Sequence, residues 1–385
     1  MRKFARIITP LLAVGLTFGA LGMVAAAEDA ETIKIGFIGP LTGPNAQSGQ
    51  AALNGATIAM EEINAAGGLL GKEVEIVPYD DKSSPEESVK STTRLIEVDH
   101  VVGIMGSLHS GNVLAAGPVA EEYQVPVISG GTSPTWLEQG WLYHFRALGN
   151  SNLAMTQLAA YCNQAGWKKI AMIHSNDEYG NNGADEFNEN AEEKGLEIVA
   201  DESFTAGDKD FTGQFVKLIA SEPDVIMTWG TGSDVGSVLP QLRQAGWGGP
   251  IIGPEAYSMP ELVDIIGDAF YDVYFATAYI VYDDPADAPS EKMQTFLQNY
   301  LDKYGAKPES DNAYRNYDAM YLFANAITEA DSTDGTAIRD ALEATQGFEG
   351  LAGTFNFTGN HGEGIDSVRI FQVDVGGVYT EIPME

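Results

Sequence analysis

Short apolar segments alternate with longer amphipathic segments along most of this chain, beginning at Ile33. The short segments have the length and β-branched content of buried strands, and the longer ones repeat apolar residues at helical spacing. Helix signals agree, because Ser84-Pro85-Glu86-Glu87 is typical of a helix start and Gln164-Ala165-Gly166 of a helix end. The predicted strands are Ile33–Ile38, Val74–Tyr79, Val101–Met105, Val125–Ile128, Ile170–His174, Leu196–Val199, Val225–Trp229 and Ile251–Gly253. The predicted helices between them include Ala51–Ala65, Glu86–Val98, Leu153–Ala165, Gly183–Lys194 and Val235–Gln244.

Alternation of strands and helices predicts parallel sheets covered by helices on both faces. The pattern runs once to about Arg146, pauses at Ala147–Ser151 and restarts, which indicates two similar α/β lobes, each an open, doubly wound parallel sheet. After Phe275 it changes to long helices and two late strands, so the chain returns between the lobes. These later elements are Glu291–Tyr304, Asp311–Ala330, Thr336–Ala344, Gly353–Phe357 and Ser367–Val373. We assign 28–150 plus 280–350 to the N-terminal lobe and 151–279 plus 351–385 to the C-terminal lobe.

The first residues have the pattern of an export signal. Three basic residues among the first six precede an apolar run from Ile7 to Val24, which ends in Ala25-Ala26-Ala27 and then turns acidic at Glu28. A short membrane anchor is the alternative, but Pro10 and three glycines interrupt the run and small residues end it. The sequence therefore predicts a signal peptide at 1–27, cleaved on export, and a periplasmic mature protein.

Composition excludes several classes of protein. The 385 residues contain 21 Lys+Arg against 55 Asp+Glu, a formal net charge of -34. Nucleic-acid contacts need clustered basic residues, so no nucleic-acid partner is predicted, and docking on anionic lipid is disfavoured for the same reason. The single Cys162 excludes an intrachain disulfide and a Cys-rich metal site.

Motifs of catalysis and of cofactor binding are missing from the sequence. The stretch Gly230–Gly236 follows a predicted strand but lacks the spacing of a dinucleotide loop, and Gly68–Glu73 lacks that of a P-loop. The five histidines show no metal-ligand spacing, and no nucleophile elbow occurs. We therefore predict no metal, no cofactor and no enzymatic activity.

Open parallel sheets bind ligands at the carboxyl ends of their strands, so the loops that follow the strands carry the candidate site. Ser107–Asn112 and Ser129–Pro134 follow successive strands, and their hydroxyls and helix-start amides suit a small anion such as a carboxylate. The alternative is that Ser110 and Thr132 only cap helices. Glu255 follows another strand and suits a ligand ammonium, unless it is a solvated loop carboxylate. Tyr179 either covers the ligand or packs on its helix.

An ordered set of motifs resembles the type I periplasmic binding proteins of ABC transporters, and within them the Leu/Ile/Val-binding group. The resemblance runs from about Ile33 to the C-terminus. It rests on Ile35–Pro44, Glu62–Gly68, Pro78–Asp81, Asp177–Gly180, Phe204–Phe211 and Gly253–Glu255.

The resemblance implies two lobes joined by three hinge crossings that close on a ligand. It places an amino acid's carboxylate on Ser110, Gly130 and Thr132, its ammonium on Glu255, and Tyr179 over the ligand. Leu108 and His109 lie beside Ser110 in the same loop.

Four positions depart from the pattern of the group. Ser48 stands where the family has an aromatic residue, Thr231 where it has a tyrosine, and Ser83 and His109 where close relatives have a cysteine pair. These changes predict a roomier, more polar side-chain pocket that accepts larger or more polar side chains than Leu, Ile or Val. The alternative is that Trp229 refills the space and restores an aliphatic-sized pocket.

The sequence thus predicts a monomeric periplasmic substrate-binding protein that captures an amino acid, branched-chain or broader, and delivers it to a membrane permease. Two alternatives stay open. One is a binding protein for a short amide, urea or another small polar solute, and the other is a soluble accessory protein that senses its ligand.

Overall fold

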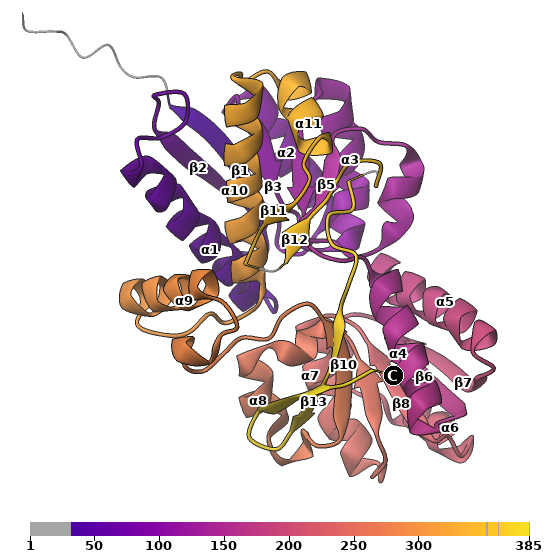
Figure 1. Cartoon of the computed structure of the whole chain (residues 1–385). Coiled ribbons are helices and arrows are strands. Elements are labelled where there is room, and N and C mark those ends of the chain that lie inside the picture. Colours follow the sequence, from indigo (N-terminus) through magenta and orange to yellow (C-terminus); the bar gives the residue numbers. More distant parts are fainter. Residues whose placement is uncertain (1–31, 352, 361, 385) are drawn as a thin grey trace, which may run out of the picture. The chain divides into compact units, whose positions relative to one another are not determined.

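Two β-sheets, each covered by helices, organise the computed structural model of this chain (Figure 1). The structure describes residues 32–351, 353–360 and 362–384, so the predicted signal peptide at 1–27 lies outside the described residues. Each sheet has its own buried apolar residues on both faces. The predicted fold of two α/β lobes is therefore confirmed.

The first lobe is built on a parallel sheet of order β2-β1-β3-β4-β5. Apolar residues of α1, α9, α10 and α11 pack on one face, and those of α2 and α3 on the other. The strands are β1 (Ile33–Gly39), β2 (Val74–Asp80), β3 (Gly103–Met105), β4 (Val127–Ser129) and β5 (His144–Arg146). The helices are α1 (Ala46–Ala65), α2 (Pro85–Glu97), α3 (Ser110–Tyr123), η1 (Pro134–Gln139), η4 (Pro285–Asp287), α9 (Glu291–Tyr304), α10 (Asn312–Ala330) and α11 (Gly335–Glu343).

The second lobe is built on a larger sheet of order β14-β13-β10-β9-β8-β6-β7. Its members from β10 to β7 are parallel, whereas β13 and β14 add an antiparallel edge. The strands are β6 (Lys169–Ser175), β7 (Glu197–Phe204), β8 (Val225–Trp229), β9 (Ile251–Gly253), β10 (Val273–Thr277), β13 (Arg369–Asp374) and β14 (Val378–Ile382). The helices are α4 (Ser151–Ala165), α5 (Glu178–Glu193), α6 (Thr212–Ala220), α7 (Gly232–Gln244), η2 (Glu255–Ser258), α8 (Pro260–Ile266) and η3 (Gly267–Ala269).

The chain passes between the lobes three times, after β5, after β10 and before β13. At the second passage Ile280 packs in the second core, whereas Tyr279 and Val281 pack in the first. The third lies later than predicted. Residues 351–365 were assigned to the second lobe, but Leu351, Phe355 and Ile365 pack in the first core, beside the hairpin of β11 (Phe348–Glu349) and β12 (Thr354–Phe355).

All eight strands expected in the two sheets are present, with ends shifted by a few residues. The pattern did not predict β5, β10 or β14. The strand β5 has only three residues, and the edge strand β14 has only exposed and half-buried positions, so neither gives a strong hydrophobic period.

Helices α1 and α10 cross at close range because α1 carries a glycine at the contact. A Cβ atom on Gly55 would lie 2.0 Å from the carbonyl oxygen of Ala313 in α10. This contact fixes the start of α10, which contributes to the cavity described below, against the middle of α1.

We expect the substitution Gly55→Ala to destabilise the protein by about 1–3 kcal/mol, because the added methyl group overpacks two backbones that cannot both stay in place. Urea unfolding of the full chain, followed through the transition of residues 32–385, measures this change in the free energy of unfolding. Gly213→Ala is the matched control, since Gly213 in α6 has no neighbouring atom within 4 Å of a new Cβ. The control should be unchanged or gain up to about 1 kcal/mol, and equal stabilities of the two variants would contradict the prediction.

Candidate functional site

The carboxyl ends of the parallel strands of both lobes face one cavity of about 480 Å³. Its first-lobe wall comes from the starts of α1, α2, α3 and α10, and its second-lobe wall from the starts of α5 and α7, the loop before α6 and η2. The first amide N–H groups of a helix have no acceptor inside the helix, so this arrangement turns several unpaired donors toward the cavity.

Nine of the ten residues predicted for the site line this cavity: Ser48, Leu108, His109, Ser110, Gly130, Thr132, Tyr179, Thr231 and Glu255. The tenth, Trp229, does not. Its side chain is 1% exposed in the core between the second sheet and α5, where its ring lies 5.2 Å from that of Tyr179. Trp229 therefore supports Tyr179 from behind, and Tyr257, whose hydroxyl lies 2.5 Å from Thr228 Oγ1, is likewise a core residue.

Two hydroxyls from neighbouring strands form one end of the cavity. The Ser110 Oγ accepts a hydrogen bond from the Ser133 amide at 3.1 Å, which leaves the hydroxyl proton of Ser110 free to donate. The Thr132 Oγ1 is buried and has no hydrogen-bond partner among the described residues. A buried polar group without a partner costs about 1–3 kcal/mol, so this hydroxyl is one that a ligand can satisfy. With the free first amides of α3, the end carries donors suited to a carboxylate.

Gly130 contributes by close packing and not by a free amide. Its N–H already donates to the carbonyl oxygen of Ser107 at 2.9 Å. A Cβ atom on Gly130 would lie 3.0 Å from a methyl carbon of Leu108. The expectation that the Gly130 backbone holds a carboxylate is therefore wrong for its N–H group.

A buried arginine braces the loop that carries Thr132. Arg146, the last residue of β5, donates to the carbonyl oxygens of Gly131 and of Ser133, the latter at 2.9 Å. Its Nε donates to Glu363 Oε1 at 2.9 Å, and its guanidinium lies 4.5 Å from the ring centre of Trp136. The loop that presents Thr132 is thereby tied to Glu363, in the segment of the first lobe that leads into the third crossing.

Glu255 lies across the cavity on η2, and its contacts come from both lobes. The Tyr179 hydroxyl donates to Glu255 Oε2 at 3.1 Å, and the Arg315 Nη2 lies 3.9 Å from Glu255 Oε1. Burial raises the pKa of the Glu255 carboxyl, and the Arg315 charge opposes that rise. Burial and the Glu255 charge together raise the pKa of Tyr179, so this hydroxyl stays protonated and donates.

The other carboxylates at the cavity already have partners within the protein. Asp177 accepts from the Gly180 amide at 2.8 Å at the start of α5, and Asp234 accepts from the Thr231 hydroxyl at 2.7 Å at the start of α7. Glu178 accepts from the Ser133 hydroxyl at 3.2 Å. Glu255 differs from these three carboxylates because its partners are a hydroxyl of its own lobe and a guanidinium of the other lobe.

The remaining predicted residues line the wall away from these charged groups. The Ser48 Oγ lies 4.0 Å from the Met259 sulfur, so Met259 of the second lobe occupies part of the space that the small Ser48 leaves. Burial lowers the pKa of the His109 imidazole, although Asp81, Asp177 and Asp234 oppose that shift. His109 is therefore a neutral ring with one donor and one acceptor nitrogen.

Sequence reasoning missed Arg315, Asp311 and Met259, all of which line the cavity. Arg315 and Asp311 come from the start of α10, which the chain reaches only after its second passage between the lobes. The predicted helix Asp311–Ala330 gave the right element but no reason to direct its first turn at the strand ends. Met259 follows Glu255 by four residues, and its apolar side chain gave no signal.

Within the described residues no group of three His, Cys, Asp or Glu side chains is placed to hold a metal ion. In the same part of the chain no helix combines the length and apolar character needed to cross a membrane. The geometry is that of a cavity between two lobes, with donors at one end, a carboxylate opposite, and polar and apolar groups along the wall. Fold and cavity together define a two-lobed binding protein.

The sequence profile of the family described as periplasmic binding protein matches residues 32–377, and the chain belongs to this family. Its members are the substrate-binding proteins of transporters and not enzymes, as predicted.

The relatives and solved structures that this chain resembles are also named as binding proteins. The chain is 29% identical over 341 residues to a leucine-, isoleucine-, valine-, threonine- and alanine-binding protein of Pseudomonas aeruginosa, covering 87% of this chain and 88% of the relative. Among solved structures, a leucine-binding protein of Thermotoga maritima superposes with a TM-score of 0.83 at 28% identity, over 91% of this chain and 98% of that one. A branched-chain amino acid transporter substrate-binding protein of Streptococcus pneumoniae, in complex with isoleucine, gives 0.82 at 30% identity, over 91% and 99%.

One buried carboxyl group near the first crossing has no role in the cavity. Glu186 of α5 is 8% exposed, and both of its carboxylate oxygens are buried without a hydrogen-bond partner among the described residues. Its charged neighbours are Arg146, Glu189 and Glu363. Burial raises the pKa of Glu186 from 4.5 to about 7, and the nearby Ser151 and Arg146 offset only part of this rise.

We expect Glu186→Gln to stabilise the protein at pH 8 and to leave it unchanged near pH 4.5. The folded pKa of Glu186 lies above the unfolded value, so the native protein binds this proton more tightly than the unfolded chain. The wild-type free energy of unfolding therefore falls as pH rises from 4.5 to about 7. The amide removes this loss, a gain on the order of 2–3 kcal/mol above pH 7. Urea unfolding across that range measures the difference.

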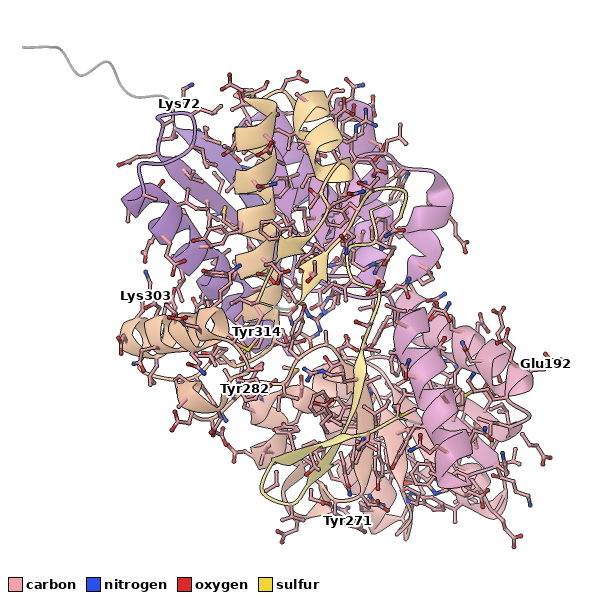
Figure 2. All side chains as sticks on the ribbon, in the orientation of Figure 1. Lys72, Glu192, Tyr271, Tyr282, Lys303 and Tyr314 are labelled. Carbon is pink, nitrogen blue, oxygen red and sulfur yellow. The ribbon has the colours of Figure 1, made fainter. Side chains whose placement is uncertain are left out.

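Glu192→Gln is the control on the same helix, because Glu192 is exposed at the outer side of the second lobe (Figure 2). It should track the wild type at every pH. A constant difference between Glu186→Gln and the wild type from pH 4.5 to pH 8 would contradict the assignment.

Proposed function

We propose that this protein captures an α-amino acid in the cavity between its lobes and delivers it to the membrane permease of an ABC transporter. The observation that carries the proposal is the pairing of the unsatisfied Thr132 hydroxyl and the Ser110 hydroxyl on one lobe with the Glu255 carboxylate on the other. Donors at one end and a carboxylate at the opposite wall match the two charges of an amino acid.

In this scheme the ligand carboxylate accepts from Ser110, Thr132 and the first amides of α3. The ammonium donates to Glu255, and Tyr179 covers the ligand while it holds the second oxygen of that carboxylate. Ser48, Leu108, His109 and Thr231, together with Met259, contact the ligand side chain. Trp229 is not included, because it lies behind Tyr179 in the core.

Relatives whose names state amino-acid binding support the ligand class, since they cover most of this chain. We further propose that the mature protein begins at Glu28, works as a monomer in the periplasm, and closes its two lobes on the ligand. The intact mass of the exported protein tests the cleavage site, and retention of the apolar segment would contradict it.

A thermal-shift screen over the amino acids, short amides, urea and small organic acids tests the function. A ligand at about 100 times its Kd adds about 2.7 kcal/mol to stability. We expect shifts with amino acids and none with urea, short amides or the matching hydroxy acids. A shift with urea or an amide alone would replace the proposal with the alternative ligand class.

Within the amino acids we expect Met, Phe, Gln or Thr to bind at least as well as Leu, Ile and Val. The reason is that Ser48 and Thr231 are small polar groups on the wall and that Trp229 and Tyr257 lie outside the cavity. Competition calorimetry with equal ligand concentrations measures the order. Preference for Leu, Ile and Val over all four would show that Met259 restores an aliphatic-sized pocket.

The substitution Glu255→Gln should weaken binding of the best amino acid by about 30-fold or more, because losing one partner of a buried charge pair costs about 2–5 kcal/mol. The free energy of unfolding should change far less than the free energy of binding, since Glu255 lines the cavity and Arg315 keeps Asp311 as a partner. Isothermal calorimetry and urea unfolding of the same preparations separate the two effects.

Glu261→Gln is the matched control, because Glu261 lies in the neighbouring helix α8 and does not line the cavity. It should bind with wild-type affinity. Equal affinities of Glu255→Gln and the wild type would remove Glu255 from the site and leave the carboxylate end to be tested separately.

A further inference from the structure

Arg315 is a buried cation that reaches the cavity from the first lobe and meets Glu255 of the second. Its side chain is 6% exposed and belongs to the first turn of α10, next to Tyr314, which is labelled where α10 approaches the second lobe (Figure 2). Its Nη2 lies 3.9 Å from Glu255 Oε1. The pair therefore spans the cavity between lobes.

Within α10 and its preceding loop, Arg315 is anchored by one carboxylate. The Nη2 also donates to Asp311 Oδ2, four residues earlier, and the Asp311 side chain is 4% exposed. The Arg315 Nε is buried and has no hydrogen-bond partner among the described residues. A guanidinium has five donors in a fixed plane, so Asp311 fixes Arg315 without satisfying it.

The charges around Glu255 do not cancel. Glu255 and Asp311 carry two negative charges against one positive charge on Arg315, and the other groups that face them are the hydroxyls of Tyr179 and Tyr279. Burial alone would lower the pKa of Arg315, but Asp311 and Glu255 outweigh it and raise this pKa, so the guanidinium stays charged. One unit of negative charge remains for a cationic ligand group.

We propose that Arg315 is a positioning residue for ligand capture: from the first lobe it holds the Glu255 carboxylate of the second in place, and a bound ligand's ammonium shares that carboxylate with it. This inference rests on the proposed function, because it needs an ammonium at Glu255. It adds to that function a group, Arg315, that determines at which pH Glu255 can accept the ammonium.

The sharing of Glu255 has two opposite effects on affinity. The positive charge of Arg315 keeps Glu255 ionised against the effect of burial, which favours ammonium binding at acidic pH. At higher pH, where Glu255 is ionised in any case, the same charge lies close to the ammonium and competes with it. Removing the charge should therefore weaken binding at low pH and leave it equal or tighter at high pH.

The test is calorimetry of L-leucine binding to the wild type and to Arg315→Met from about pH 5 to about pH 8. Wild-type affinity should fall on the acidic side as Glu255 takes up a proton. In Arg315→Met this fall should move up by about one pH unit or more, the size expected for loss of an opposite charge within 4–6 Å. In the Glu255→Gln background, Arg315→Met should no longer shift the pH dependence of leucine affinity.

Lys303→Met is the matched control, because it removes one positive charge from α9, where Lys303 is paired with Glu61 away from the cavity (Figure 2). Its pH profile should coincide with that of the wild type. A uniform loss of affinity in Arg315→Met at every pH would overturn the proposal, since it would mean that Arg315 only supports the fold.

Two further variants test the role of Arg315 if Arg315→Met fails to unfold cooperatively. Arg315→Lys keeps the charge and should keep the wild-type pH profile. Asp311→Asn leaves Arg315 with Glu255 as its remaining carboxylate, so leucine should bind more weakly at every pH. Wild-type leucine binding in Asp311→Asn would overturn the proposal. If the wild type itself shows no heat with leucine or any other amino acid, the proposed function fails, and the inference falls with it.

Discussion

In a parallel sheet the carboxyl ends of all strands lie at one edge, so the loops and helices that follow the strands start there. This constraint decides which groups line the cavity. In both lobes the helices that follow the strands begin at the same edge, so α3, α5 and α7 bring their unpaired first amides to the cavity, and the returning chain adds α10. These helix starts favour negative charge. Asp177 and Asp234 satisfy two of them from within the chain. Among the described residues no carboxylate accepts from the first amides of α3, and the proposed function places the ligand carboxylate there.

The second consequence is a balance of buried charge that neither lobe holds alone. Glu255 is buried enough for its pKa to rise, yet it stands between a hydroxyl from its own lobe, that of Tyr179, and a guanidinium from the other, that of Arg315. A buried carboxylate that loses one of its partners destabilises the protein, so buried charges occur together with the groups that pair with them. Asp311 completes the set by fixing Arg315. The charged groups of the cavity therefore depend on one another, although they come from both lobes.

Strand-end reasoning selected residues that line the cavity because it depends only on local order: a buried strand, then a loop, then a helix. Ser110, Thr132, Tyr179 and Glu255 all follow strands directly, and all line the cavity. Trp229 shows the limit of this logic, since as the last residue of β8 its side chain turns to the sheet face under α5 and not beyond the strand end. Arg315 shows another limit, because α10 reaches the cavity through tertiary packing against α1 that no local pattern encodes.

The loop that carries Thr132 depends on a different buried cation. Arg146 ends β5, so its guanidinium lies where the chain leaves the first lobe, and it joins the carbonyls of Gly131 and Ser133 to Glu363, which precedes the third crossing. Glu186 of the second lobe is a further charged neighbour. Carbonyl acceptors around a buried arginine replace its hydration only at fixed geometry. The loop that carries Thr132 and the segment that leads into the third crossing are thus held by the same cation, and neither can shift without a cost at the other.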